Sequence, residues 1–300
     1  MSKKYKRGEG SFGEWISTII WAGIIAILFR SFLLEPFNIP SGSMIPTLHV
    51  GDHIFVQKWS YGFSRYSFPF GSWKLWEGRF WEKKPVRGDI IVFRTPDNTT
   101  DYVKRLIGMP GDSIQVRAGR LYINNEQIKR EYKGRYVIAI LPKMLRDAGF
   151  QRVDSKLNHI MVIKGNEIFE DNKPADYKYT VEYKDDAICR LRPDECIIHE
   201  GSLYEETLPN GRKYEIVKIT DNGRYDNTPV YQVPTGHYFF MGDDRDLSAD
   251  SRAGLGFVPA DNLMGRVWFI FYSHNYYAPL PFVWDWKYKL RFERFGRIVK

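Results

Sequence analysis

Residues 101–112 read DYVKRLIGMPGD, and this stretch decides the fold class. Its first part is rich in aromatic and β-branched residues and is closed by a Gly-Met-Pro-Gly-Asp turn signal, which is typical of a β-strand. Successive side chains of a strand point to opposite faces, so Lys104 shares one face with Tyr102 and Leu106, while Arg105 points the other way. The stretch therefore predicts a strand that places a lysine among apolar neighbours.

Runs of the same kind recur along the chain after residue 35. Each is short, apolar and bounded by Gly, Pro or Asp, whereas helical periodicity is scarce and no internal repeat is visible. These runs are His53–Val56, Ile90–Phe93, Tyr238–Met241 and Val267–Tyr272. We predict a mainly β fold, with an antiparallel β core formed by residues 35–112 and 237–281. The more polar residues 113–236 are predicted to be an inserted second domain that is also rich in β structure.

The N-terminal residues have a different character. Residues 1–14 carry four basic side chains against two acidic ones, and residues 15–34 read WISTIIWAGIIAILFRSFLL. Twenty residues in a helix rise about 30 Å, which matches the hydrocarbon thickness of a bilayer. Arg30 lies near one end, where its charge can reach the headgroups. The pattern predicts one transmembrane helix at residues 15–34.

A cleavable signal peptide is the competing interpretation of this segment. A cleavage site would place small residues just after the apolar stretch, but Ala22 and Ala26 lie inside it and no A-x-A pattern follows. The sequence therefore favours an uncleaved anchor. The positive-inside rule then predicts a cytoplasmic N-terminus at residues 1–14. We expect a single-pass protein of the inner (plasma) membrane, with its main domain on the periplasmic, extracytoplasmic side.

The composition narrows the classes of partner. A hydrophobic content of 43% is sufficient for a real core. The net charge of +8 comes from 44 basic and 36 acidic residues that are scattered without a long basic block, so a solvated surface explains it. With an extracytoplasmic location, nucleic acid is not expected as a partner, whereas membrane phospholipid is.

Two aromatic segments have two interpretations each. Residues 61–81 hold nine aromatic side chains, which either pack in the core or rest in the membrane interface. Residues 282–300 form a basic, aromatic C-terminal segment, in which apolar and charged residues alternate from Trp284 to Glu293. This alternation predicts a strand, either at an ordinary sheet edge or with a basic face near anionic lipid.

The chain has two cysteines, Cys189 and Cys196. On the oxidising side of a membrane such a pair can form a disulfide, and two free thiols are the alternative because sequence does not give the distance between them. A C-x6-C spacing without a second pair argues against zinc.

A candidate nucleophile follows the predicted span directly, in residues 39–48, IPSGSMIPTL. Alone, this segment is typical of a turn. Gly42 lets another backbone approach closely, and Ser43 on such a turn can present its hydroxyl. A serine hydroxyl is a weak nucleophile and requires a base.

Lysine is the candidate base. The six histidines lie in no recognisable catalytic context, and no G-x-S-x-G elbow occurs. Neither H-E-x-x-H nor a paired metal-ligand spacing occurs, so no metal is expected. Lys104, if enclosed by apolar groups, loses hydration, and its pKa falls toward neutrality. An ordinary surface lysine is the alternative. Residues 242–252, GDDRDLSADSR, are either a solvated loop or an ion-pair network that holds a hydroxyl such as Ser248 beside the lysine.

Four segments together resemble the sequence boxes of bacterial type I signal peptidases (leader peptidases). They are residues 35–48 (EPFNIPSGSMIPTL), 88–93 (GDIIVF), 101–112 (DYVKRLIGMPGD) and 242–252 (GDDRDLSADSR). The resemblance spans residues 35–112 and 237–270 and includes the N-terminal anchor.

The resemblance implies a Ser/Lys dyad, in which Ser43 attacks the scissile carbonyl and Lys104 removes its proton. The Ser43 N–H and the Ser41 hydroxyl would form the oxyanion hole, and Ser248 would orient Lys104. The implied substrate-binding residues are Pro36, Phe37, Ile39, Met44 and Val103. The implied structural residues near the site are Tyr102, Arg105 with Asp243, and Asp250 with Arg252. Asp244, where asparagine is common in the family, and Leu247 are expected to carry no chemistry.

The resemblance further implies a membrane-bound serine endopeptidase that removes N-terminal signal peptides from secreted preproteins. It would cut after small residues, as in A-x-A, without a cofactor. Two alternatives remain: a Ser/Lys processing peptidase with a narrow substrate range, and a membrane-tethered, non-catalytic binding module. The module leaves the segments around Ser43, Lys104 and Ser248 unexplained.

Overall fold

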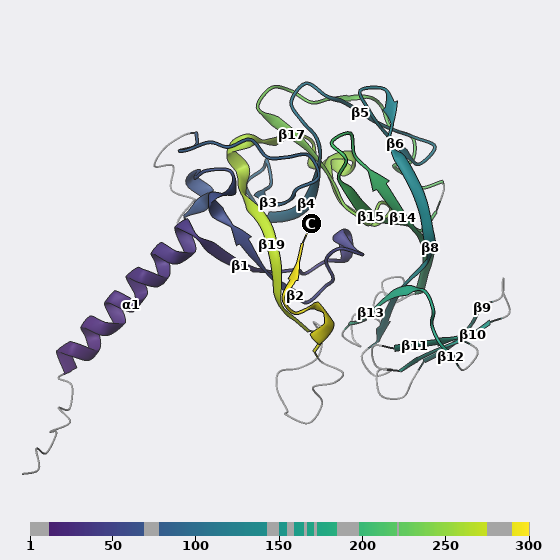
Figure 1. The fold of residues 1–300 in the computed structure, drawn as a ribbon, viewed down its shortest axis with the longest axis horizontal. Coiled ribbons are helices and arrows are strands. Elements are labelled where there is room, and N and C mark those ends of the chain that lie inside the picture. Colours follow the sequence, from purple (N-terminus) through teal and green to yellow (C-terminus); the bar gives the residue numbers. More distant parts are fainter. Residues whose placement is uncertain are drawn as a thin grey trace, which may run out of the picture.

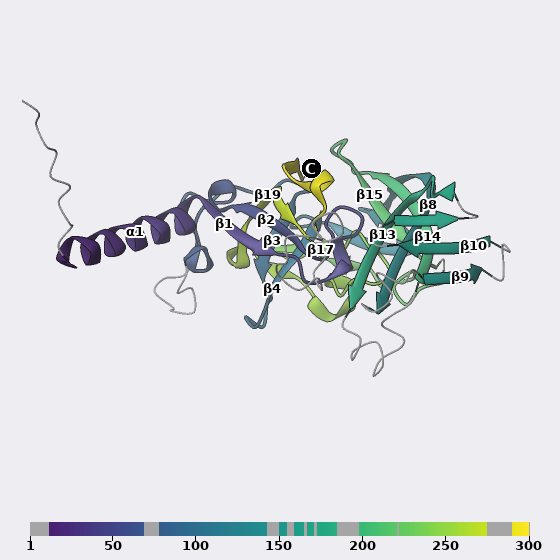
Figure 2. The same ribbon diagram turned by 90° about the horizontal axis from the view of Figure 1, so that it is seen from below.

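The computed structural model describes residues 12–68, 78–142, 150–154, 159–164, 167–170, 173–184, 198–220, 222–274 and 290–299. A single long helix, α1 (Phe12–Phe32), projects from a body of β-sheets (Figures 1 and 2). Within the described ranges it is the one helix long and apolar enough to cross a membrane, and its side chains are exposed apart from Ser31. The helix begins three residues before the predicted span of residues 15–34. It ends two residues before the end of that span, because Leu34 already belongs to the first strand.

The largest sheet contains the strands on both sides of the predicted insertion. Its order is β1-β2-β19-β3-β4-β17-β18, with β20 paired to β19, and all of its pairs are antiparallel. All five strand-like runs of the sequence are strands here. The bounds are β1 (Leu34–Asn38), β2 (Asp52–Gln57), β3 (Ile90–Arg94), β4 (Asp101–Gly108), β17 (His237–Met241), β18 (Val258–Pro259), β19 (Leu263–Ser273) and β20 (Arg297–Ile298).

The residues between β4 and β17 form three four-stranded sheets. One has the order β16-β5-β6-β7, with β5 (Ser113–Arg117), β6 (Arg120–Ile123), β7 (Glu126–Gln127) and β16 (Tyr231–Gln232). The second, β13-β8-β14-β15, contains β8 (Lys129–Pro142), β13 (Lys178–Lys184), β14 (Ile198–Thr207) and β15 (Lys213–Lys218), and its β8–β13 pair is parallel. The third is β12-β11-β10-β9, with β9 (Phe150–Asp154), β10 (His159–Lys164), β11 (Glu167–Glu170) and β12 (Lys173–Pro174). The fold is mainly β and mostly antiparallel, as predicted.

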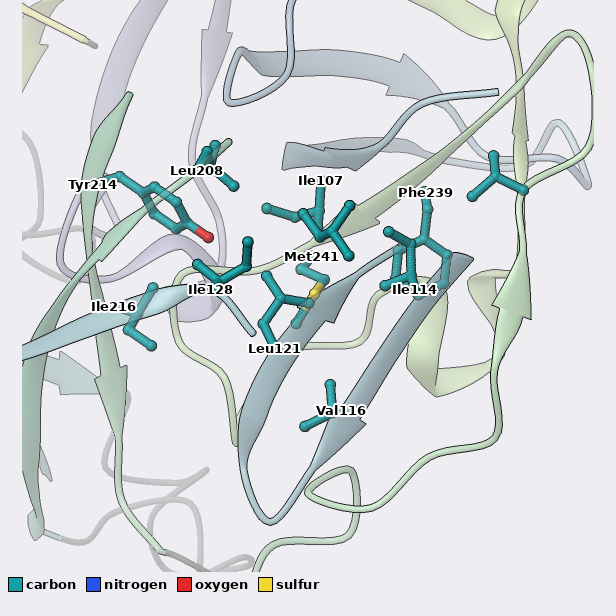
Figure 3. Close-up of a cluster of buried hydrophobic side chains, with 12 residues drawn as sticks. Ile107, Ile114, Val116, Leu121, Ile128, Leu208, Tyr214, Ile216, Phe239 and Met241 are labelled. Atoms are coloured by element: carbon teal, nitrogen blue, oxygen red, sulfur yellow. The ribbon is translucent and has the colours of Figure 1, made fainter. Parts of the chain in front are cut away.

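The first of these three sheets shares a core with the largest sheet. Ile107 of β4 and Met241 of β17 pack in one buried cluster with Ile114 and Leu121, which come from β5 and β6 (Figure 3). Burial of this apolar surface joins β5 and β6 to the strands that carry the candidate site. The division into residues 35–112 with 237–281 and an insertion at 113–236 stays a prediction.

The helix is joined to the sheet by a charged cluster. The Glu35 carboxylate is buried and lies 2.7 Å from Arg30 Nη2 and 2.5 Å from Lys58 Nζ. The sequence placed Arg30 near the headgroups, and its side chain is indeed half exposed, but its guanidinium is bound to Glu35. Phe32 also packs against the ring of Phe63, with 5.3 Å between centroids.

The aromatic side chains of residues 61–81 divide between the core and the surface. Tyr61, Phe63 and Tyr66 are buried, as the core interpretation expected, whereas Phe80 and Trp81 are 56% and 78% exposed. Residues 69–77 lie outside the described part of the chain.

The C-terminal segment departs from the predicted strand where it is described. Phe292–Arg294 form a 3₁₀ turn, and β20 begins only at Arg297. Arg291 and Arg294 are buried, so these two basic side chains do not face lipid. The predicted Cys189–Cys196 disulfide lies outside the described residues, as does Trp284.

Candidate active site

Ser43 lies on a 3₁₀ turn, Gly42–Met44, just beyond β1. The residues after Ser43 anchor this turn on two sides. Met44 is fully buried in a cluster with Ile54 of β2, and Ile45 is buried in another cluster with Ile138 of β8. Close packing on both sides fixes the backbone, so the position of the Ser43 hydroxyl is set by the core.

Lys104 of β4 points at this hydroxyl. Its Nζ lies 2.6 Å from Ser43 Oγ and also donates a hydrogen bond to the Val103 carbonyl at 3.1 Å. The side chain is only 4% exposed, and this burial lowers the pKa of the Lys104 ammonium to about 8, although Asp250 and Asp243 act in the opposite direction. A fraction of the lysine is therefore neutral at physiological pH and can accept a proton from the hydroxyl.

The two acids nearest this lysine are each bound to an arginine. Arg105 Nη2 lies 2.7 Å from Asp243 Oδ2, and its Nε donates to Oδ1 at 2.8 Å. Arg252 Nη2 lies 2.7 Å from Asp250 Oδ2, which also accepts the Gly242 backbone N–H at 3.0 Å. Bidentate pairing of this kind satisfies the carboxylates and fixes their geometry. It brings together the four charged residues that the sequence singled out as structural.

Gly242 is required for the packing behind the nucleophile. A Cβ on this residue would lie 2.1 Å from Ser248 Oγ and 2.5 Å from the Ser43 carbonyl oxygen. Ser248 thus lies in the site, where the sequence placed it. Its hydroxyl is buried and has no hydrogen-bond partner among the described residues, and no contact with Lys104 is seen. The sequence named this glycine in a motif but gave no reason for it.

The remaining predicted residues line the approach to Ser43. Ser41 is exposed, with its Oγ 3.4 Å from Ser43 Oγ. Tyr102 lies beside Lys104, whose Nζ is 5.2 Å from the ring centroid. The five residues predicted to bind substrate differ in exposure: Ile39 and Met44 are buried, Phe37 and Val103 are half buried against the same apolar cluster, and Pro36 is exposed.

Two strand edges near Ser43 and Lys104 are open in this arrangement. β1 is the first strand of its sheet. On β4, the pairing with β17 covers Arg105–Gly108, so the part Asp101–Lys104 has no strand on that side among the described residues. An extended peptide can add to such edges through main-chain hydrogen bonds.

Sequence reasoning missed several residues near the nucleophile. Asp244, which was expected to carry no chemistry, is buried, and its backbone N–H donates to the Ser43 carbonyl at 3.2 Å. Thr47 donates to Asp243 Oδ2 at 2.5 Å, and the buried Arg245 binds Glu206 of β14. Motif spacing gives no signal for these contacts, since each partner lies far away in the chain.

Most of this chain is similar in sequence to known proteins of one family. A family model described as signal peptidase, peptidase S26, matches residues 12–272. Signal peptidase I of Rickettsia typhi is 37% identical over 257 residues, covering 83% of this chain and 76% of the relative. Signal peptidase I of Rickettsia conorii is 37% identical over 280 residues, covering 91% and 81%.

A solved signal peptidase I from Enterococcus faecalis is 25% identical, with a TM-score of 0.26, over 61% of this chain and 97% of that chain. The family match and the two rickettsial relatives extend over most of the sequence, and the family match includes the turn of Ser43 and the strand of Lys104. The chain therefore belongs to the signal peptidase family, peptidase S26, and is a serine endopeptidase.

Proposed function

We propose that this protein removes N-terminal signal peptides from exported preproteins, with Ser43 as the nucleophile and Lys104 as the general base. The observation that carries this proposal is the 2.6 Å separation of Lys104 Nζ and Ser43 Oγ, together with the burial that lowers the pKa of the lysine to about 8. A buried lysine with a lowered pKa that contacts a hydroxyl instead of a carboxylate is typical of a functional site.

The mechanism follows from these positions. Lys104 takes the hydroxyl proton as Ser43 Oγ bonds to the scissile carbonyl carbon, and the resulting oxyanion is stabilised by the Ser43 N–H and the Ser41 hydroxyl. The carbon–nitrogen bond then breaks, and the lysine ammonium protonates the departing amine. Water, activated by the neutral lysine, hydrolyses the ester and restores both groups. Ser248 is the candidate to orient the lysine, since its hydroxyl is buried in the site without another partner among the described residues.

The substrate segment before the scissile bond is proposed to run as a strand along β1 and β4. Phe37 and Val103 form the rim of an apolar cluster that is closed beneath by Ile39 and Met44. We infer that the surface above the two buried residues offers a substrate side chain little depth, so that small side chains of the A-x-A type fit it best.

The location and lipid contact follow from the anchor. We propose that α1 crosses the plasma membrane once, with residues 1–14 in the cytoplasm and the β body outside. Enzyme and signal peptide then share one bilayer, which raises their effective concentration and limits their orientation. The exposed Phe80 and Trp81 support a phospholipid contact, since the Trp81 ring packs 6.1 Å from Phe63, which touches the end of α1.

Cleavage of a preprotein by the purified protein in detergent tests the proposal. We expect product with the wild type, loss of nearly all product with Ser43→Ala and with Lys104→Arg, and normal rates with Lys129→Arg, whose side chain is 72% exposed. An arginine stays protonated and cannot act as a base.

The wild-type kcat/KM should rise with pH through about 8, because only the neutral form of Lys104 accepts a proton. Normal cleavage by Lys104→Arg would overturn the dyad, and no cleavage by the wild type would favour the binding module. Cleavage of one preprotein among several unrelated ones would favour the narrow-range peptidase.

A further inference from the structure

A pocket of about 290 Å³ opens beside the nucleophile, and no residue of β4 lines it. Its walls include Ser41 and Ser43, the apolar side chains of Ile138 and Ile140 from β8, and Asp244 with Leu247. None of the residues assigned above to the segment before the scissile bond lines it: Pro36, Phe37, Ile39, Met44 and Val103 are all absent from this wall.

This division indicates which part of a substrate the pocket receives. An extended peptide passes the nucleophile once, so the residues before and after the scissile bond leave Ser43 in opposite directions. On the path proposed above, the residues before the bond lie against Phe37 and Val103, which pack on one apolar cluster. The pocket between Ser43, Ile140 and Leu247 is therefore placed to take the first residues of the released protein.

The polar wall of this pocket carries a buried carboxyl without a cationic partner. Asp244 is 1% exposed, and its Oδ1 accepts the Leu247 N–H at 3.0 Å. Its nearest charged neighbours are already bound, since Asp246 contacts Lys218 and Arg252 contacts Asp250. Across the parts of the chain that the structure describes, no lysine or arginine forms an ion pair with Asp244.

We propose that this pocket binds the side chain of the first or second residue after the scissile bond, and that Asp244 selects cationic over acidic residues there. The inference rests on the proposed signal peptide cleavage and adds a charge preference on the far side of the bond. A carboxylate in a partly enclosed, apolar site attracts an ammonium or guanidinium and repels a second carboxylate more strongly than it would in water. Ile138, Ile140 and Leu247 contact the aliphatic stem of a lysine or arginine.

Asp244→Asn is an isosteric test of the charge. The Asn Oδ1 can still accept the Leu247 N–H, so the loop keeps its hydrogen bond while the negative charge is removed. Glu126→Gln is the matched control, because it removes one negative charge from an exposed side chain on β7.

The measurement compares preproteins that differ only at one position, with Lys, Gln or Glu as the first residue after the scissile bond, and a second set varied at the next residue. At pH 8 we expect the wild type and Glu126→Gln to prefer the Lys substrate over the Glu substrate in one of the two sets. The kcat/KM for the Lys substrate should be about tenfold higher, because one close charge pair contributes a free energy of at least this order. In Asp244→Asn the ratio of the kcat/KM for the Lys substrate to that for the Glu substrate should fall to near one. The kcat/KM for the Gln substrate should change least.

Two results would overturn the inference. One is a wild type that cleaves Lys, Gln and Glu substrates equally in both sets, and the other is an unchanged Lys-to-Glu ratio in Asp244→Asn. Both leave the proposed function intact, provided that Ser43→Ala abolishes cleavage of the Gln substrate. Absence of cleavage of every substrate by the wild type would instead reject the proposed function itself.

Discussion

Lys104 is one of three buried lysines in the described residues, and its surroundings differ from those of the other two. Lys58 lies 2.5 Å from a Glu35 oxygen, and Lys218 lies 2.6 Å from a carboxylate oxygen of Asp226. Each of these ammonium groups is compensated by a direct charge. Lys104 contacts a hydroxyl and a carbonyl instead, and the nearby acids are engaged by arginines. Burial lowers the pKa of both Lys58 and Lys104, but only Lys58 has a carboxylate in direct contact to stabilise its ammonium form.

Ser41→Ala should slow cleavage without abolishing it. The Ser41 hydroxyl is 3.4 Å from Ser43 Oγ and is a candidate donor to the oxyanion, while the backbone N–H of Ser43 would remain. Loss of one donor costs on the order of 3 kcal/mol, or about 100-fold in kcat. Single-turnover kinetics would separate this effect from binding. If the Ser41→Ala variant keeps the wild-type kcat, the Ser41 hydroxyl is not part of the oxyanion hole.

Asp244→Asn should change stability as a function of pH. Burial raises the pKa of the Asp244 carboxyl to about 7. The folded state thus favours the protonated acid, so the stability that Asp244 contributes is fully present below its unfolded pKa and is lost as the pH rises through about 7. We expect Asp244→Asn to have a higher Tm than the wild type at pH 8 and little difference at pH 5. A Tm difference that does not depend on pH would contradict this assignment.

At the scale of elements, the end of α1 and the neighbouring loops form one surface. Phe32 of the helix packs on Phe63, and Trp81 packs on the other side of Phe63. Aromatic side chains with this exposure are favoured at the boundary between headgroups and hydrocarbon. The buried Glu35, bound to both Arg30 and Lys58, connects this boundary to the strand that leads to Ser43.

Replacing Phe80 and Trp81 together by serine should lower cleavage of a membrane-inserted preprotein in phospholipid vesicles several-fold. Cleavage of a short soluble peptide in detergent should be unaffected, because neither side chain lines the candidate site. Val230→Ser, which removes a half-exposed apolar side chain in the loop before β16, is the control. Equal losses in vesicles and in detergent would show that these residues act on the fold and not through lipid.

Over the whole molecule, the last described residues hold the segment behind the nucleophile. Arg294 Nε donates to Asp52 Oδ1 at 2.9 Å, and its Nη2 donates to the Thr47 carbonyl at 3.0 Å. Arg291 donates to the Val50 carbonyl at 2.8 Å. Two arginines from the C-terminal segment thus fix the loop between Ser43 and β2.

Arg294→Met should therefore destabilise the protein and reduce kcat. Removing one partner of a buried ion pair leaves an uncompensated Asp52 carboxylate, which costs roughly 3 kcal/mol. Thermal unfolding and cleavage assays would measure both effects, with Arg297→Met as the control because Arg297 is exposed. An unchanged Tm would show that the loop is held by other contacts.

By itself, the sequence predicted five strands of the largest sheet and the apolar N-terminal helix, and it proposed the pairing of Ser43 with Lys104. Alternation around Lys104 and turn residues after each run are local properties of the chain, so β4 and its neighbours could be assigned without coordinates. The family boxes added roles for Ser43 and Ser248 because those motifs are long and continuous.

Only the tertiary structure decided what surrounds those residues. The contact of Lys104 with Ser43 joins positions 61 residues apart, and the hold of Arg294 on Asp52 joins positions 242 apart. The need for glycine at 242 and the burial of the Asp244 carboxyl, which has no cationic partner in the described part of the chain, also arise from packing between distant segments. Burial and pKa depend on which side chains meet in space, and a local pattern of residue types does not contain that information.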